Sequence, residues 1–189
     1  MTHIENTHPY TTTSQSGVTL MEMIAALAII AVIIVGSLAL YNAATSSQSS
    51  TQMVQDVTSL RAAVKQIYLG QGSYGTGDLS GVLVKANRLP STIKAVTTTT
   101  AGENGASSTS STTFKSVLNG DVTITGSGAS FTIKVEKIPS DVCIPLLTNT
   151  TGWTEVDIGS TKITSFPVSA ATAATDCGSG DQTITFTSN

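Results

Sequence analysis

Basic residues and histidines are scarce in this sequence, and their distribution argues against two kinds of binding site. The 189-residue chain has a formal net charge of −3, only 11% charged residues, and no lysine or arginine before Arg61. A nucleic-acid-binding surface needs basic residues gathered on one face, whereas the nine basic residues here are scattered. The two histidines, His3 and His8, both stand near the start of the chain. The sequence therefore predicts no nucleic-acid site, no metal site and no cofactor.

An enzyme is not expected either, because the residues that catalysis needs are missing. No histidine follows His8, and no candidate nucleophile has a recognisable base. The glycines between Gly70 and Gly77 follow a predicted helix rather than a strand. That order does not suit a phosphate-binding loop, which precedes its helix. The sequence indicates a structural or binding protein.

Cysteine is also rare, and Cys143 and Cys177 are the whole complement. A pair late in a chain with an export-like N-terminus favours one disulfide in an oxidising compartment. In the chain-entropy model, closing a loop of this length stabilises the fold by roughly 3–4 kcal/mol. The alternatives are two free buried thiols in a cytosolic protein, or half of a metal site.

One long apolar run dominates the N-terminal part of the sequence. From Met23 to Tyr41 there are 19 residues without a charge or a proline. At a rise of about 1.5 Å per residue, a helix of that length crosses the hydrocarbon core of a bilayer. A buried helix of a soluble protein is the alternative, but such a helix is rarely apolar on every face. We therefore predict a membrane helix.

The order of elements around this run argues against an ordinary secretory signal peptide. Such a signal has a basic start, an apolar stretch of roughly 7–15 residues and then a cleavage site. Here no basic residue precedes the run, the run is longer, and the cleavage-like pair Ser16-Gly17 comes before it. This order is expected when the apolar segment is kept in the mature protein.

Glu22 is the residue of this region most indicative of function. A carboxylate one turn into a membrane helix costs several kcal/mol unless it is neutralised, paired or near the interface. If the chain is cut after Gly17, Val18 carries a new α-amino group about one helical turn from Glu22, and the acid also favours the helix dipole. Glu22 then either pairs with the Val18 amine of a neighbouring subunit, which sets the register of a polymer, or is solvated at the interface.

The segment from Gly17 to Glu22, GVTLME, followed by the apolar run, resembles the class III signal of type IV pilins and pseudopilins. The resemblance implies that a prepilin peptidase cuts after Gly17 and methylates the new terminus at Val18, and that Glu22 guides assembly. Two departures are the absence of lysine and arginine in residues 1–17 and of proline in the apolar run. The long leader and the missing proline favour the type IVb branch.

The helical pattern continues beyond the apolar run. Residues 41–52 are polar and Ser-rich, so we expect a weaker helix there, and the glycines from Gly70 onward end the helix. One helix face carries an apolar residue at steps of three and four: Met53, Val57, Leu60, Val64 and Ile67/Tyr68. The expected segments are a leader (1–17), a hydrophobic membrane and polymerisation helix (18–41), an amphipathic continuation (42–72) and a globular head (73–189).

The rest of the chain is rich in Thr, Ser and Gly and has short alternating runs. We expect Trp153 to be a packing aromatic rather than a platform for a ligand. The polar, low-complexity stretch 97–113 predicts an exposed loop. The other predicted elements are a short helix (79–89), a hairpin (121–125 and 131–136), a short helix or turn limited by Pro145 (139–147), a strand pair (153–158 and 161–165) and a final strand (183–186).

This order of elements resembles the type IVb pilins of thin pili and enteric adherence pili. The resemblance implies an α+β fold, a long N-terminal helix packed on a small antiparallel sheet, with Cys143 and Cys177 closing a disulfide-bounded C-terminal region. The implied function is a structural subunit of a type IV pilus. Before assembly it is held in the bacterial inner membrane, and afterwards it is part of an extracellular pilus. Its implied partners are other copies, met through the N-terminal helices, prepilin peptidase and the pilus assembly machinery.

Two other functions fit the same residues. The first is a pseudopilin or minor pilin of a secretion or pilus system. The second is a single-span surface receptor that does not polymerise. Adhesion, conjugation and motility are all compatible with the sequence.

Overall fold

The longest element is α1 (Leu20–Ile67), a helix of 48 residues. The structure, a computed structural model, describes residue 17, residues 19–100 and residues 109–189. The chain forms two compact units, Met1–Asn42 and Ala43–Asn189, and α1 contributes residues to both. We call the second of these the globular unit.

The Ser-rich stretch of α1 stays helical, contrary to the expected weakness. The Ser50 hydroxyl donates a hydrogen bond to the Ser46 carbonyl at 2.9 Å, and the Thr51 hydroxyl donates one to the Ser47 carbonyl at 3.1 Å. A hydroxyl that bonds to the carbonyl one turn earlier is not available to stabilise a non-helical backbone. The helix therefore passes through residues 41–52 without a break.

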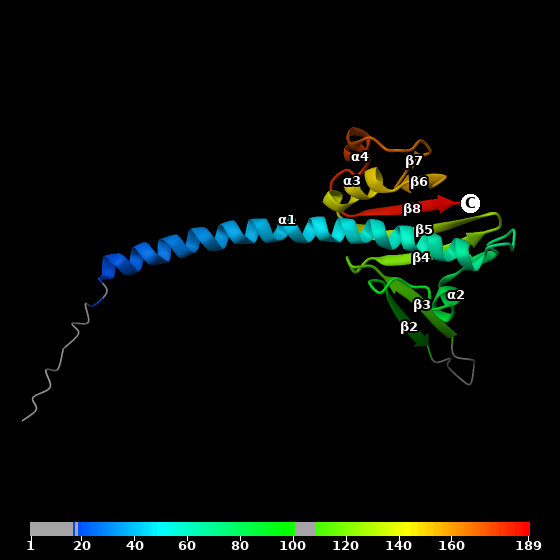
Figure 1. Cartoon of the computed structure of the whole chain (residues 1–189), viewed down its shortest axis with the longest axis horizontal. Coiled ribbons are helices and arrows are strands. Elements are labelled where there is room, and N and C mark those ends of the chain that lie inside the picture. Colours follow the sequence, from blue (N-terminus) through cyan, green and yellow to red (C-terminus); the bar gives the residue numbers. More distant parts are fainter. Residues whose placement is uncertain (1–16, 18, 101–108) are drawn as a thin grey trace, which may run out of the picture. The chain divides into compact units, whose positions relative to one another are not determined.

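The second half of α1 packs on the sheet of the globular unit through the predicted stripe (Figure 1). Met53, Val57, Leu60 and Val64 are at most 1% exposed, and Ile67 and Tyr68 are partly buried. These side chains share one hydrophobic core with residues from the sheet strands, among them Phe114, Ile124, Ile133 and Phe186. The prediction of an amphipathic face is confirmed.

The sheet is antiparallel throughout, which confirms the predicted α+β class. Its strands are β1 (Thr76–Asp78), β2 (Lys94–Thr100), β3 (Thr109–Lys115), β4 (Asp121–Ser127), β5 (Ser130–Ile138), β6 (Glu155–Ile158), β7 (Thr161–Ile163) and β8 (Gln182–Ser188). They lie in the order β2-β3-β4-β5-β8-β6-β7, and β1 pairs with β4. The last strand of the chain thus lies between β5 and β6.

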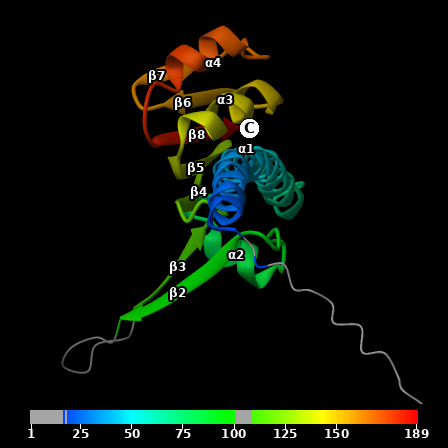
Figure 2. The same cartoon turned by 90° about the vertical axis from the view of Figure 1, so that its left-hand side faces the viewer.

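Three short helices complete the globular unit. They are α2 (Ser80–Lys85), α3 (Ser140–Asn149) and α4 (Ala170–Asp176). Figures 1 and 2 show α2 beside β2 and β3, at one end of the sheet, and α3 and α4 beside β6 and β7, at the other.

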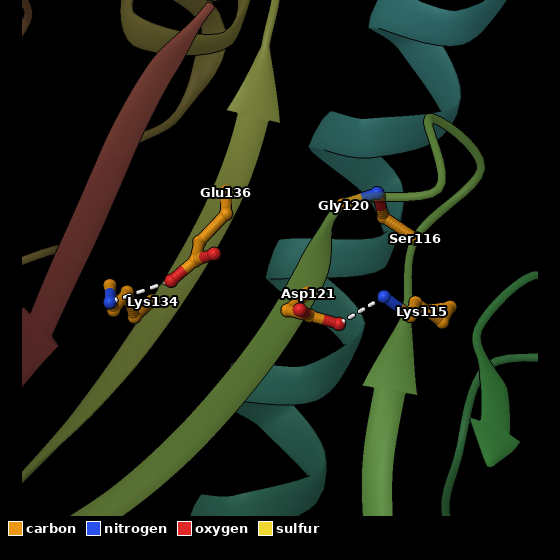
Figure 3. Close-up of polar contacts among 6 residues, drawn as sticks. All are labelled: Lys115, Ser116, Gly120, Asp121, Lys134 and Glu136. Atoms are coloured by element: carbon orange, nitrogen blue, oxygen red, sulfur yellow. Dashed lines mark hydrogen bonds and ion pairs between the residues drawn. The ribbon is translucent and has the colours of Figure 1, made fainter.

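Alternation along β4 and β5 produces one buried and one solvated face, as the hairpin prediction requires. Figure 3 shows two ion pairs on the face turned away from α1. Lys115 Nζ lies 2.5 Å from an Asp121 carboxylate oxygen, and Lys134 Nζ lies 2.7 Å from one of Glu136. Exposed pairs of this kind contribute about 0–1 kcal/mol each. The buried face, rather than these pairs, therefore stabilises the hairpin.

The predicted exposed loop at 97–113 is wrong for the part that the structure describes. Strands β2 and β3 pair there, with Thr97 opposite Thr112 and Val96 opposite Thr113. Threonine is β-branched and fits a pleated strand, so a run of threonines favours a ribbon although its composition is polar. The rest of the predicted loop, residues 101–108, lies outside the described residues.

The helices also differ from expectation. α2 covers only part of the predicted 79–89 helix, because Asn87 adopts a left-handed conformation with φ of 53°. α3 continues past Pro145 to Asn149, so that proline does not limit it. A proline in the helix interior removes one backbone hydrogen bond, in this case the bond to the carbonyl of Asp141, which is an exposed residue that water can reach.

β1 and α4 were not predicted. The only sequence signal for α4 is Ser169 before an alanine-rich run. Ser169 is the N-cap and accepts a hydrogen bond from the Thr172 N–H at 3.1 Å. A serine cap with alanines after it is a favourable helix start.

Gly120 is required by close packing of two backbones. A Cβ atom at this position would lie 1.8 Å from the carbonyl oxygen of Glu136. The Gly120 N–H also donates to the Ser116 hydroxyl at 3.2 Å (Figure 3), which holds the turn before β4. Because the obstructing atom is backbone, it cannot rotate away.

We expect Gly120→Ala to lower the free energy of unfolding by roughly 1–3 kcal/mol, the usual cost of overpacking. Urea unfolding of the full chain in detergent, followed by the fluorescence of its single tryptophan, measures this effect. Gly81→Ala is the matched control, because no atom lies within 4 Å of the added Cβ there. Equal stability of the two variants would contradict the proposed backbone clash.

Asp56 is a buried carboxyl group on the part of α1 that lies past the apolar run. It is 4% exposed, and one of its carboxylate oxygens accepts a hydrogen bond from the Thr92 hydroxyl. The other carboxylate oxygen is buried and has no hydrogen-bond partner among the described residues. Burial raises the pKa of Asp56, and the hydrogen bond from Thr92 partly opposes that shift. The charged form therefore destabilises the folded state.

Because this pKa is raised, we predict that the effect of Asp56→Asn on the free energy of unfolding depends on pH. The folded wild type binds a proton more readily than the unfolded chain, whose aspartates titrate near about 3.9. Above the pKa that Asp56 has in the folded state, its charge therefore destabilises the fold. This destabilisation disappears as the pH falls from that pKa to the lower pKa of the unfolded chain. Relative to wild type, Asp56→Asn should be most stable near about pH 7 and lose that advantage toward about pH 4. Urea unfolding at both pH values tests this, and a difference that does not change with pH would contradict it.

Candidate processing and assembly site

The start of α1 is capped by Thr19, the second residue after the predicted cleavage position. The Thr19 hydroxyl accepts a hydrogen bond from the Glu22 N–H at 3.3 Å, and the Thr19 carbonyl accepts one from the same N–H at 3.0 Å. Thr19 and Glu22 have the spacing of a capping box, in which the acid at the third helical position supports the cap. The sequence reasoning identified Glu22 but missed Thr19, although the Thr-x-x-Glu pattern was present to find it.

The predicted cleavage residues lie at the boundary of the described chain. Gly17 is described and exposed, whereas Val18, the expected site of methylation, lies outside the described residues. Glu22 is exposed and is the acidic residue in the first turn of α1. An acid there interacts favourably with the helix dipole.

The apolar run after Glu22 has no contacts that bury it. The large hydrophobic side chains of residues 20–41 are all more than half exposed. Among the described residues, one helix, α1, is long and apolar enough to cross a membrane, with a mean hydropathy of 2.9 in its most apolar window. Apolar surface left in water costs about 25 cal/mol per Å². This segment therefore needs lipid or other apolar helices around it.

The polar group inside the apolar run is satisfied within the helix. The Ser37 hydroxyl donates a hydrogen bond to the Ile34 carbonyl at 2.9 Å. In an apolar environment a hydroxyl without a partner would cost several kcal/mol. The run is therefore compatible with an environment that excludes water.

The two cysteines form the predicted disulfide. Cys143 lies in α3, Cys177 follows α4, and their Cα atoms are 5.9 Å apart. Both residues are fully buried, and the bridge closes a segment that contains β6 and β7. The alternative of two free thiols is therefore wrong. No group of three potential metal-ligating side chains occurs in residues 19–100 and 109–189.

Arg61 joins α1 to the C-terminal part of the sheet. Its guanidinium lies over the ring of Trp153 at 5.1 Å, and its Nε donates a hydrogen bond to the Ser188 hydroxyl at 3.1 Å. Trp153 is 5% exposed and packs against Phe186 with ring centroids 5.0 Å apart. The prediction that Trp153 is a packing aromatic is confirmed. Sequence reasoning missed the role of Arg61, because its partners are distant in the chain.

Two family models match the chain, one over most of the apolar run and the other over nearly all of the globular unit. The model described as PilS N terminal matches residues 46–189, and the model described as prokaryotic N-terminal methylation motif matches residues 12–38. No curated protein matches the chain.

Two solved structures have the same fold. A type IVb pilin from Salmonella typhi is 18% identical, with a TM-score of 0.53 over 74% of this chain and 98% of that one. TcpA, a type IV pilin from Vibrio cholerae El Tor, is 17% identical, with a TM-score of 0.51 over 75% of this chain and 99% of that one. Both relatives are pilins, which are structural proteins. The chain belongs to the PilS N-terminal family and is a type IV pilin with the fold of the type IVb branch.

Proposed function

We propose that this pilin is made as a precursor, cut between Gly17 and Val18, and assembled into a pilus through the apolar part of α1. The observation that carries the proposal is an exposed apolar helical segment whose first turn is capped by Thr19 and carries the carboxylate of Glu22. The match to the N-terminal methylation motif spans the same residues and supports methylation of Val18. The leader is then residues 1–17 and the mature chain begins at Val18.

Assembly moves the apolar segment from one water-free environment to another. In the inner membrane, lipid surrounds residues 18–41; in the fibre, the same segments of neighbouring copies surround it. Apolar surface is not exposed to water in either state, so the hydrophobic cost in water does not oppose the transfer. The amphipathic continuation, residues 42–72, of which α1 covers the part up to Ile67, and the head, residues 73–189, then lie outside this apolar core.

Glu22 supplies the specificity that apolar contacts lack. Packing between apolar helices has little directional preference, so it does not by itself fix one axial register. A carboxylate among apolar helices is costly unless it is paired, and the new amine of Val18 on a neighbouring copy is a suitable partner. Pairing of the two groups would select one register and leave no charge unpaired.

Mass spectrometry of the protein from its native host tests the processing step. Intact and N-terminal peptide masses should show a chain that starts at a methylated Val18 and carries one disulfide. A sheared surface fraction from the same cells should contain that mature chain. A chain that starts at Met1, or one cut beyond the apolar run, would contradict the proposal and favour an anchored receptor or a secreted domain.

A further inference from the structure

The glycine-rich segment after α1 folds back against the turn between β4 and β5 (Figure 1). The Tyr74 N–H donates a hydrogen bond to the Gly128 carbonyl at 2.7 Å, and the Gly128 N–H donates one to the Gly75 carbonyl at 2.8 Å. The Ser73 hydroxyl donates to the same Gly128 carbonyl at 3.2 Å. A Cβ atom at Gly126 would lie 2.5 Å from the Tyr74 carbonyl oxygen, so the two backbones are in close contact. The segment is therefore fixed to the sheet at several points.

This segment forms an open groove with the first turn of α2. The groove has a volume of about 420 Å³, within the range of about 300–1,000 Å³ that is usual for small-molecule sites. None of the residues that line it is basic, and one, Asp78, is acidic. An anionic ligand would therefore meet a negative charge without a compensating positive one. We call this site the tyrosine groove, and its aromatic and polar side chains are Tyr68, Gln71, Ser73, Tyr74, Thr76 and Asp78.

Two tyrosines provide the aromatic surface of the tyrosine groove. The ring centroids of Tyr68 and Tyr74 lie 5.5 Å apart, and the Tyr74 ring lies 4.8 Å from the fully buried ring of Phe131. Both tyrosines pack against the core and remain partly exposed. An aromatic face carries negative charge density and attracts groups with a slight positive charge, such as polarised C–H groups. The tyrosines thus suit a ligand that has C–H groups on one face.

The polar side chains of the groove are oriented by contacts inside the chain. One carboxylate oxygen of Asp78 accepts hydrogen bonds from the Ser80 N–H at 2.9 Å and the Ser80 hydroxyl at 2.6 Å. Asp78 is exposed and forms no ion pair with a described residue, so its second oxygen can accept a bond from a ligand. The Gln71 amide donates to the Ile67 carbonyl at 3.3 Å, which leaves its second N–H and its oxygen for a ligand.

We propose that the tyrosine groove binds a neutral saccharide. A sugar ring presents C–H groups on its faces and hydroxyl groups around its edge, and each hydroxyl both donates and accepts hydrogen bonds. These are the two kinds of surface that the tyrosines and the oriented polar side chains complement. An ammonium group would also interact favourably with tyrosine rings and a carboxylate. It has no acceptor, however, for the second N–H of Gln71 or the Thr76 hydroxyl.

The site lies within the globular unit, so binding requires neither cleavage after Gly17 nor assembly. The inference goes beyond the proposed function, because it adds a ligand to a structural subunit. The two can also fail separately. Loss of saccharide binding is measured on the unassembled chain, whereas loss of processing or of fibres is measured on cells.

Saturation-transfer difference NMR of the full chain, in a detergent without a sugar headgroup, tests the proposal. The probes are three neutral disaccharides (lactose, maltose and chitobiose), choline as a cation and glucose 6-phosphate as an anion. At least one disaccharide should bind with a Kd on the order of 1 mM, and choline and glucose 6-phosphate at least about tenfold more weakly. No transfer from any disaccharide at about 20 mM, or tighter binding of choline or glucose 6-phosphate, would overturn the proposal.

Variants of the groove show whether the bound disaccharide occupies it. Asp78→Asn and Tyr68→Leu should each raise the Kd at least about tenfold, and Gln71→Ala at least about threefold. Tyr68→Phe keeps the ring and should stay within about threefold of wild type. The matched control is Gln66→Ala, because Gln66 is an exposed residue of α1 that does not line the groove. Urea unfolding should show that every variant is folded. Unchanged binding by Asp78→Asn and Gln71→Ala, or an equal loss in Gln66→Ala, would refute the site.

Discussion

Replacing Glu22 with valine is expected to abolish fibres while the subunit still accumulates in the inner membrane. The change removes the carboxylate proposed to pair with the Val18 amine of a neighbour, which leaves that amine unpaired in an apolar core, at a cost of several kcal/mol. Membrane insertion should persist, since valine makes the helix more apolar. The measurement is the ratio of pilin in the sheared surface fraction to pilin in the membrane fraction, which should fall at least about a hundredfold.

Glu22→Gln separates the two roles that the structure allows for this residue. Glutamine at the third helical position keeps the capping-box spacing with Thr19 but carries no charge. If pairing with the amine is what matters, Glu22→Gln should lose fibres as completely as Glu22→Val. Normal piliation with glutamine would show that Glu22 serves as a helix cap and would refute the pairing. Thr19→Ala, which removes only the cap at a cost of about 1 kcal/mol, should still assemble.

Elements with a clear hydrophobic period were predictable from the sequence. The buried stripe of α1 and the alternating hairpin of β4 and β5 follow the helix and strand periods, and the structure has both. The β2–β3 ribbon was missed because its polar threonines suggested a loop, although their β-branched side chains favour strands. α4 was missed because an alanine-rich run has almost no polar and apolar contrast, so only the cap at Ser169 signals it.

The candidate site, too, could be predicted from the sequence only in part. Glu22 and the position of Gly17 were identifiable because the whole signal lies within six consecutive residues and the apolar run that follows. Contacts such as Arg61 with Trp153, or Asp56 with Thr92, join residues from distant parts of the chain. They depend on which helix face packs on which strands. Two cysteines, by contrast, allow only one intramolecular pairing, so the disulfide could be predicted once export was inferred.

Removing the disulfide should have the largest effect on the stability of the globular unit. The bridge between Cys143 and Cys177 spans 34 residues, and closing a loop of that length stabilises by roughly 3–4 kcal/mol in the chain-entropy model. We expect Cys143→Ala with Cys177→Ala to lower the free energy of unfolding by about that amount and to reduce the level of subunit in the cell. Urea unfolding of the full chain in detergent provides the measurement.

Reduction of the wild type supplies the control for this prediction. Because both sulfur atoms are fully buried, the double variant loses apolar packing as well as the bridge, whereas reduced wild type loses mainly the bridge. Dithiothreitol should destabilise the wild type by most of the loss seen in the double variant and leave the variant unchanged. A reduced wild type as stable as the oxidised one would contradict the prediction. It would show that packing, rather than the disulfide, stabilises α3 and α4.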